Sequence, residues 1–398
     1  MSLLERLSQE SAWDSFYEYK THLTCPKDLA RELEAFIAAR AYLPVCERIQ
    51  EGQDFPLPRK AEISKMGSSK KRTVYIYPKE ENTVLKLLTY LLLREYDGLF
   101  APNLYSFRPQ RTAKDAVRTL SRIRGIRQMY VYKVDISNYF NSIPLGRFLP
   151  VLEETLAADP KLLAFLKKLL QETRVITAEG IWEEEKGIMA GTPLSAFYAN
   201  LYLKDLDQWF YDQHIPYARY SDDIIVFAES REAAERAADR IRDVLKEKGL
   251  KVNPKKESFS SPEEGWTFLG FSCRDGVIDI APATLTKLKG KMRRKARALL
   301  RWRKRNGIEG EKAAAAFIRI FNRKLFESPD ENELSWSYWF FSVINTTESL
   351  NVIDRYAQEC LRYLISGTRT KARYNIRYED LKKLGYRSLV HEYYSFQA

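Results

Sequence analysis

The chain has 398 residues, of which 45% are hydrophobic and 30% charged, the composition of a globular protein with roughly two or three domains. Its longest apolar run, TVLKLLTYLLL, is about half a membrane span and contains Lys86, and its acidic start does not fit a signal peptide, so no membrane association is expected. A net charge of +12 favours a polyanionic partner, whereas four scattered cysteines and three histidines argue against disulfides and zinc and fit a cytoplasmic protein.

The first 59 residues predict a helical extension. PKDLARELEAFIAARAYL places Leu29, Leu33 and Phe36 at helical spacing. After a basic loop, RTVYIYP alternates apolar and polar residues from Arg72 to Pro78, which predicts a strand. Residues 83–96 then have one wide apolar face, which predicts a helix.

The middle of the chain mixes strands and helices. MYVYKVDI predicts a strand over 129–136, and residues 193–212 predict one helix. ARYSDDIIVFAE predicts two short strands joined by a tight turn at two acids, followed by a helix from Ser230 to Lys248. LKVN and WTFLGFSC predict further strands. Because the links are of hairpin length, the pattern favours the α+β class.

From residue 281 onward the chain predicts basic helices. LTKLKGKMRRKARALLRWRKRN carries eleven Lys and Arg around a narrow apolar seam. A solvated helix that packs through its seam would explain this pattern, but the density of charge favours nucleic acid. The seam consists of Leu285, Leu288, Met292, Ala296 and Leu299, and the residues expected to contact nucleic acid are Lys287, Lys291, Arg293, Arg294, Arg297 and Arg301.

Three carboxylates lie at predicted strand ends or turns: Asp135, Asp222 and Asp223. Magnesium prefers oxygen ligands, and two such ions about 3.5–4 Å apart promote phosphoryl transfer when acids from neighbouring strands project to one point. An Asp-Asp pair is more often ordinary turn chemistry, and Asp135 alone could cap a helix. The acids alone therefore leave both interpretations open.

Several motifs together, in order over residues 60–275, resemble the reverse transcriptases, specifically the bacterial ones. The palm motifs A to E of that family resemble VDISNYFNSIP, GIMAGTPLSAFYANLYLKDLD, YSDD, LKVNPKKESF and FLGF. Two fingers blocks resemble RTVYIYPKEENTVLKLL and LYSFRPQRTAKDAV. Motif C is usually YADD and the second fingers block usually SYGFRP, so Ser221 and Ser106 are variants.

The resemblance implies an α+β right-hand polymerase, with fingers, a palm that carries a small antiparallel sheet, and an all-helical basic thumb. It divides the chain into an N-terminal helical extension over 1–59, fingers over 60–128, a palm over 129–280 with a fingers insertion around 146–188, and a thumb with a C-terminal tail over 281–398. Neither an endonuclease nor an RNase H domain is expected.

The resemblance also implies roles for individual residues. Two Mg²⁺ ions would lie at Asp135, Ile136, Asp222 and Asp223, of which the three aspartates are catalytic. The incoming dNTP would meet Arg72, Phe140, Ala190, Gly191 and Lys256, with Arg72 on the triphosphate and Phe140 in the space of a 2′-hydroxyl. Phe140 could equally be a core aromatic and Lys256 a surface lysine. Nucleic acid would contact Lys70, Lys71 and Arg108 in the fingers.

One departure separates this chain from the group II intron type. Those relatives usually have PQG in motif B, where this sequence has Met189, Ala190 and Gly191. The variant, together with a plain helical thumb, resembles the unknown-group enzymes linked to phage defence. We therefore expect an RNA-directed DNA polymerase that copies a bound structured non-coding RNA into DNA, in antiphage defence.

The sequence leaves open alternatives for the function, the priming mode and the oligomeric state. The chain could be a group II intron or retron-type reverse transcriptase, or a non-catalytic RNA-binding scaffold of the same fold, although its three intact acids weigh against a scaffold. A protein hydroxyl could prime synthesis, with Tyr393 and Tyr394 as candidates, and a homo-oligomer is possible.

Overall fold

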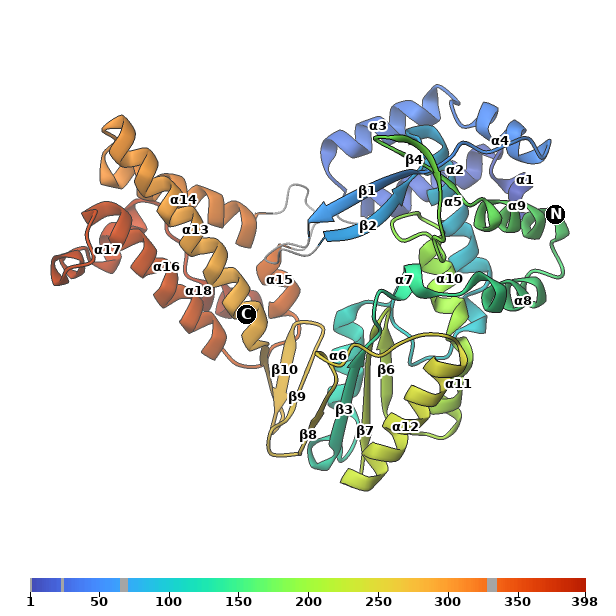
Figure 1. Ribbon diagram of the computed structural model, residues 1–398. Helices are drawn as coiled ribbons and strands as arrows, with labels where there is room; N and C mark the ends of the chain where they lie inside the picture. Colours follow the sequence, from blue (N-terminus) through green and yellow to red (C-terminus); the bar gives the residue numbers. More distant parts are fainter. Residues whose placement is uncertain (1, 23–24, 65–70, 328–334) are drawn as a thin grey trace. The chain divides into compact units, whose positions relative to one another are not determined.

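A computed structural model describes residues 2–22, 25–64, 71–327 and 335–398 (Figure 1). The chain forms two compact units, Met1–Glu264 and Gly265–Ala398, each of which is described by itself. The division precedes the last three strands, whereas the sequence placed the start of the thumb after them, at residue 281.

The larger unit begins with the predicted helices. They surround the long helix α5, and Trp13 stacks on Tyr42 at a ring distance of 4.7 Å in their shared core. Because α5 buries leucines along most of its length, it anchors this extension to the rest of the unit. The bounds are α1 Leu3–Arg6, α2 Glu10–His22, α3 Lys27–Ala38, α4 Leu43–Gln50 and α5 Lys79–Glu95.

A four-stranded sheet in the order β2-β1-β4-β5 follows. β1 and β2 pair antiparallel, as the alternating RTVYIYP predicted for β2, and β4 lies parallel to β1 at its start. The strands are β1 Arg59–Ser64, β2 Lys71–Ile76, β4 Arg174–Thr177 and β5 Gly180–Glu183. Further helices of this unit are η1 Asp97–Leu99, α6 Ala113–Arg122, η2 Ile126–Gln128, α8 Leu145–Thr155 and α9 Pro160–Gln171.

The second sheet of this unit has the order β6-β7-β3-β8, and every pairing in it is antiparallel. Helix α12 packs on β3 and β7, and α11 on β6, beside the sheet in Figure 1. The strands are β3 Tyr130–Asp135, β6 Tyr217–Tyr220, β7 Asp223–Ala228 and β8 Ser258–Ser260, and the helices are α7 Tyr139–Ser142, α10 Ser195–Tyr202, α11 Lys204–Asp212 and α12 Arg231–Glu247.

Two local predictions are corrected. The single helix predicted over 193–212 is divided at Leu203, because α10 is buried on nearly all sides whereas α11 packs only one face on the sheet. The strand predicted for LKVN is reduced to one bridge between Ile136 and Val252, since the chain has just turned back at Gly249, whose φ is +73°.

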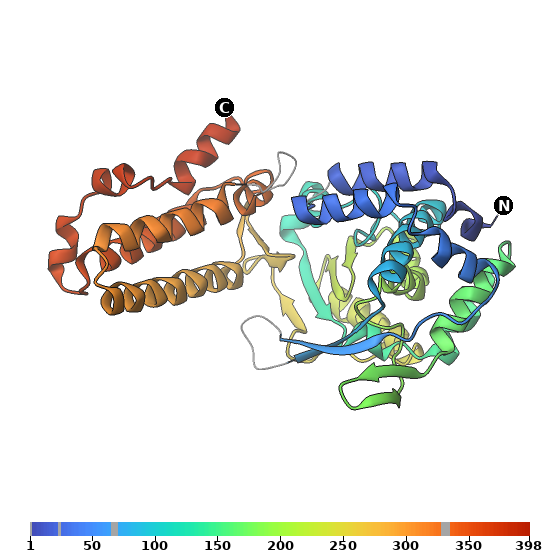
Figure 2. The same cartoon turned by 90° about the horizontal axis from the view of Figure 1, so that it is seen from above.

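The smaller unit combines a three-stranded antiparallel sheet with helices. The strands are β9 Trp266–Phe268, β10 Phe271–Arg274 and β11 Val277–Ile280. The helices are α13 Pro282–Asn306, α14 Gly310–Leu325, α15 Trp336–Phe341, α16 Glu348–Ser366, η3 Lys371–Asn375, α17 Tyr378–Lys383 and α18 Leu389–Gln397. Helices α13 and α14 lie side by side in both views, and α13 also packs on α16 (Figure 2). The buried seam of α13 ends on Leu300 rather than on the predicted Leu299.

Two further features concern membrane-spanning helices and cysteines. Among the residues that it describes, no helix is long and apolar enough to cross a membrane. All four cysteines are buried, and their sulfurs are thiols.

Candidate active site

The sheet β6-β7-β3-β8 brings the three predicted aspartates to one edge. Asp135 ends β3 and pairs directly across the ladder with Asp223, the first residue of β7. Between β6 and β7 the turn is only Ser221 and Asp222, and the carbonyl of Asp222 accepts a hydrogen bond of 3.0 Å from the amide of Ile136. The register of three strands therefore fixes these acids as a group.

The electrostatics of this group favour a bound cation. Burial, followed by the charge of Asp135, raises the pKa of Asp222 above its usual range. Burial, followed by the charge of Asp222, raises the pKa of Asp223 in the same way. Neighbouring carboxylates that resist ionisation gain most from a divalent cation, which neutralises their repulsion.

The protein does not offer a closed metal cage. Within the described ranges, no three His, Cys, Asp or Glu side chains are arranged as a metal-binding cluster. Magnesium does not require one, since it keeps several waters and uses one or two carboxylates together with substrate phosphates. The oxygen donors of Asp135, Asp222 and Asp223 fit that open kind of site.

A protein cation already lies against Asp135. The ammonium of Lys256 forms an ion pair with Oδ2 of Asp135, and Nδ2 of Asn253 donates to Oδ1 at 3.1 Å. Burial lowers the pKa of Lys256, but the hydrogen bond and charge of Asp135 outweigh it and leave that pKa above its usual value. The resemblance placed Lys256 at the incoming dNTP, and in the structure Lys256 contacts Asp135, a candidate metal ligand.

Two residues of the predicted nucleotide site lie together. The guanidinium of Arg72, on β2, is 5.6 Å from the ring centre of Phe140, on α7. The charge of Arg72 also reaches Asp222 and opposes the rise of its pKa. Lys71, which was predicted to contact nucleic acid, forms an ion pair of 2.6 Å with Glu62 on β1. Lys70, for which the same was predicted, lies outside the described residues.

Asn141 joins three segments of this site and was missed in the sequence. Its Oδ1 accepts from the amide of Ala190 at 2.9 Å, and its Nδ2 donates to the carbonyl of Thr73 at 3.3 Å. The amide of Tyr75 donates to the carbonyl of Ala190 at 2.8 Å. Gly191 has φ +96°, and a Cβ there would approach Val74 to 2.8 Å. These contacts hold the predicted motif B against β2, and the position of Asn141 next to Phe140 was the available signal.

Ser106 supports the turn that carries Asp222. The hydroxyl of Ser106 accepts from the amide of Ser221 at 2.8 Å and donates to Oδ1 of Asn200 at 3.1 Å. The Nδ2 of Asn200 donates back to the carbonyl of Ser106 at 2.7 Å, and all three residues are buried. Two positions at which this sequence departs from the motifs it resembles, Ser106 and Ser221, thus contact each other.

A buried ion pair supports the same turn from the other side. Nη2 and Nε of Arg219 lie 2.5 Å and 2.8 Å from the two carboxylate oxygens of Asp207, and both side chains are almost fully buried. Nη1 of Arg219 donates to the carbonyl of Ser221 at 3.3 Å, and Tyr217 donates to Asp207 at 2.9 Å. The backbone of Ser221 is therefore held at its amide and at its carbonyl.

For the polymerase activity that the sequence predicts, replacing Ser106 by alanine is expected to slow catalysis without weakening nucleic-acid binding. The change leaves the amide of Ser221 unpaired in a dry site, which costs about 1–3 kcal/mol. If the turn relaxes to recover that energy, we expect a roughly tenfold lower kcat, since each ~1.4 kcal/mol is a factor of ten. Steady-state extension assays with titrated dNTP would measure kcat and KM.

A matched control is Ser121→Ala, because the half-buried hydroxyl of Ser121 donates to the carbonyl of Arg118 near the C-terminal end of α6. We expect wild-type kcat from this variant. An unchanged kcat in Ser106→Ala would show that the Ser106 hydroxyl does not position the turn.

The structure corrects the prediction for Arg108. This side chain is buried, and its guanidinium binds the carboxylate of Asp97 at 2.7 Å and 3.0 Å. It also donates to the carbonyl of Ala101 at 2.7 Å. Because its donors are consumed within the fold, Arg108 is a structural residue rather than a nucleic-acid contact.

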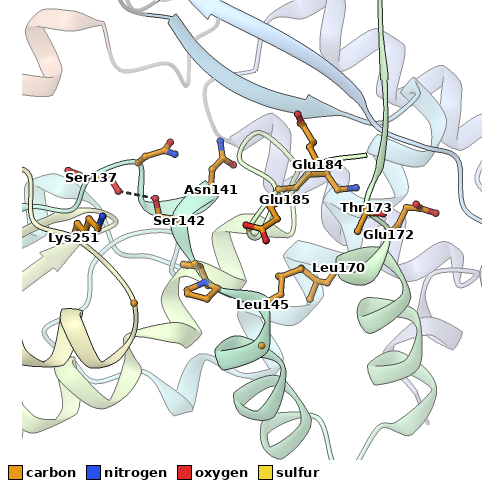
Figure 3. A pocket seen from close by; sticks show the side chains of 17 residues that line it. Ser137, Asn141, Ser142, Leu145, Leu170, Glu172, Thr173, Glu184, Glu185 and Lys251 are labelled. Carbon is orange, nitrogen blue, oxygen red and sulfur yellow. Dashed lines mark hydrogen bonds between the residues drawn. The ribbon is translucent and has the colours of Figure 1, made fainter. Parts of the chain in front are cut away.

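A cavity of about 610 Å³ lies beside the segment that follows Asp135 (Figure 3). Ser137, Asn141 and Ser142 line it on one side and Glu184 and Glu185 on another. None of the three aspartates lines this cavity. Lys186 and Lys251 line it together with these acids, so its charge is mixed and it has no clear preference for an anion.

The basic residues predicted on α13 are placed as expected along one helix. Lys287, Arg293, Arg294, Arg297 and Arg301 are exposed, and Lys291 is half-buried.

The two tyrosines proposed as primers differ in their exposure. Tyr393 is buried and donates to the carbonyl of Ile344 at 3.0 Å, so its hydroxyl is not free to act, whereas Tyr394 is 61% exposed.

Comparisons with known proteins agree with this geometry. The model of the family described as "Reverse transcriptase (RNA-dependent DNA polymerase)" matches residues 63–273. The group II intron-encoded protein LtrA of Lactococcus lactis subsp. cremoris is 25% identical over 215 residues, which cover 52% of this chain and 35% of that protein. The chain thus spans about a third of the length of that relative.

A second curated relative is covered more fully. The retron Ec73 reverse transcriptase of Escherichia coli is 25% identical over 304 residues, which cover 70% of this chain and 89% of that protein. Among solved structures, telomerase from Candida albicans in complex with a telomeric RNA fragment aligns over 90% of this chain and 66% of its own, with 14% identity and a TM-score of 0.47. Apo telomerase from Candida tropicalis aligns over 83% and 69%, with 12% identity and a TM-score of 0.48.

Proposed function

Because the chain belongs to the reverse transcriptase family, we propose that it is an RNA-directed DNA polymerase that extends a primer by magnesium-dependent nucleotidyl transfer. The observation that carries this proposal is the group of Asp135, Asp222 and Asp223 at one sheet edge. The raised pKa values of Asp222 and Asp223, and the oxygen donors of all three acids, suit two Mg²⁺ ions, which would supply an activated hydroxyl and charge neutralisation at the phosphates.

The protein's own residues position the reactants. Asp135 and Asp222 would hold Mg²⁺ at the reacting end of the primer and the triphosphate, and the guanidinium of Arg72 would neutralise phosphate charge from the side of β2. Phe140 lies under Arg72 and limits the space at the sugar. Mg²⁺ held by Asp135 would displace the ammonium of Lys256 from that carboxylate, and the ammonium would then be available to a phosphate.

We further propose that the template is a structured non-coding RNA and that the biological role is antiphage defence. Coverage of most of a retron reverse transcriptase supports such an RNA, and Ala190 in place of the intron-type glutamine favours defence over intron mobility. The protein purified with its bound RNA, given labelled dNTPs and Mg²⁺, should make DNA whose sequence identifies the template. RNA binding without incorporation of any dNTP would favour a non-catalytic scaffold instead.

Replacing Phe140 by valine is expected to admit ribonucleotides. The smaller side chain vacates the space that a 2′-hydroxyl needs, and steric terms of this size are worth about 1–3 kcal/mol. The ratio of kcat/KM for dNTP over rNTP should therefore fall at least about tenfold. Single-nucleotide incorporation of dCTP and CTP on one primer–template would measure this ratio.

The conservative variant Phe140→Tyr keeps the ring and should keep the discrimination. If Phe140→Val lost activity on both nucleotides equally, Phe140 would be a packing residue of α7, and its assignment to the sugar would be wrong.

A further inference from the structure

The smaller unit contains a hollow of about 390 Å³ between α13, α16 and η3. Arg293 and Arg297, one turn apart on α13, line it on one side, and Arg369 and Arg373 line it from the segment that follows α16. This hollow belongs wholly to residues 265–398, and its size is that of a site for a small ligand or a single nucleotide.

Positive charge in this hollow is largely uncompensated. Among the ion pairs of the described residues, none joins a carboxylate to Arg293, Arg297 or Arg369. Burial raises the pKa of the Tyr356 hydroxyl, and the charges of the same three arginines oppose that rise, so all three lie near this hydroxyl, which lines the hollow with them. Converging guanidiniums repel each other, and an anion at that point would relieve the repulsion.

Arg373 adds a donor that the fold leaves unused. Its Nη2 pairs with Glu359 at 2.9 Å and its Nη1 donates to the carbonyl of Arg369 at 2.6 Å, which fixes the guanidinium plane. The Nε of Arg373 is buried and has no hydrogen-bond partner. An unsatisfied buried donor costs about 1–3 kcal/mol, which a ligand oxygen would recover.

Aromatic rings accompany these cations. The guanidinium of Arg369 lies 5.1 Å from the ring centre of Tyr363, and the ammonium of Lys289 lies 5.2 Å from that of Tyr356. Both tyrosines line the hollow and are half-buried. Rings interleaved with guanidiniums are typical of sites for single-stranded nucleic acid, where unstacked bases lie on aromatic faces and phosphates on the cations.

We propose that this hollow, the arginine–tyrosine pocket, binds one nucleotide of a single-stranded RNA segment, with its phosphate between Arg297 and Arg369 and its base against Tyr363. The proposal rests on the proposed function, because the RNA would be the partner of the polymerase. A duplex does not fit the same role, since its bases are stacked inside and cannot reach a ring within a pocket.

The test compares two double variants that each remove two positive charges. Arg297→Gln with Arg369→Gln changes the pocket, and Lys304→Gln with Arg305→Gln changes the exposed last turn of α13. Fluorescence anisotropy would measure binding of a labelled single-stranded RNA and of an RNA–DNA duplex of equal length, over a salt series. Circular dichroism would confirm that both variants are folded.

We expect the pocket variant to lose at least about tenfold in affinity for single-stranded RNA and to show a shallower salt dependence, by about one to two phosphate contacts. Its affinity for the duplex should change no more than that of the control variant. Tyr363→Ala should also weaken single-strand binding by about 1–3 kcal/mol, or roughly tenfold, whereas Tyr363→Phe should not.

Equal losses in the pocket variant and the control variant would overturn the proposal, because the contribution would then be general surface charge. A parallel primer-extension assay separates this outcome from failure of the proposed function. Wild-type protein that binds single-stranded RNA through the pocket but extends no primer would refute the polymerase and leave the pocket, whereas extension with unaltered RNA binding in the pocket variant would refute only the pocket.

Discussion

Replacing Asp222 by asparagine should reduce nucleotide incorporation by at least about a thousandfold. The charge of Asp135 acts on the Asp222 carboxylate, and under the proposed function loss of that carboxylate removes a metal ligand that contributes several kcal/mol to stabilising the transition state. Asp135→Asn should have an effect of the same order. Single-turnover extension of a pre-annealed primer, with saturating dNTP and Mg²⁺, would measure the rate.

The stability of these variants provides the control. Because burial and Asp135 raise the folded-state pKa of Asp222, its ionisation opposes folding, and this penalty is present at neutral pH and disappears as the pH falls through the raised pKa. Without Mg²⁺, Asp222→Asn should therefore be at least as stable as the wild type at pH 7 in urea unfolding. It should also bind RNA normally. Activity near the wild-type rate would remove Asp222 from the metal site.

Asp223 is expected to be less sensitive than Asp222. It begins β7 and pairs with both Tyr220 and Asp135 through the backbone, so its side chain is fixed by the ladder rather than by the turn. The charge of Lys133 also offsets part of the rise in its pKa. The same assay on Asp223→Asn would test whether Asp222 is the more important of the two acids, as the sequence also suggested.

Local periodicity predicted the parts of this site that lie on regular elements. IIVF is buried along its whole length in β7, and MYVYKVDI forms β3, so the sequence located Asp135 and the turn correctly. The antiparallel register of two strands then requires Asp135 and Asp223 to face each other. Arg72 beside Phe140 followed from the resemblance to a family, not from periodicity.

Local periodicity could not predict contacts between segments that lie far apart along the chain. Arg108 was predicted at a nucleic-acid surface because an exposed arginine and a buried one look alike in sequence, and only the fold brings Asp97 to its guanidinium. Ser106 and Asn200 are far apart along the chain and meet through the packing of α10 beneath the turn. Burial of a polar side chain depends on such partners, which hydrophobic patterning does not encode.

Replacing Asp207 by asparagine should cost about 3–5 kcal/mol of folding free energy, the largest stability effect expected in this chain. Burial lowers the pKa of Arg219, but the charge and hydrogen bonds of Asp207 outweigh it and leave that pKa above its usual value. Arg219 therefore stays charged when Asp207 loses its charge, and an unpaired cation remains in a fully buried position. Urea unfolding followed by circular dichroism would measure the loss.

An exposed ion pair provides the contrast. Arg40 and Glu10 lie 2.9 Å apart, but each side chain is more than half exposed, so Glu10→Gln should cost less than about 1 kcal/mol. The Asp207 variant should also lose activity at temperatures where it is still folded, because Arg219 donates to the carbonyl of Ser221 in the turn that carries Asp222. If Asp207→Asn unfolded at the same urea concentration as Glu10→Gln, water or another carboxylate would have to reach Arg219, and the dry support of the turn would be disproved.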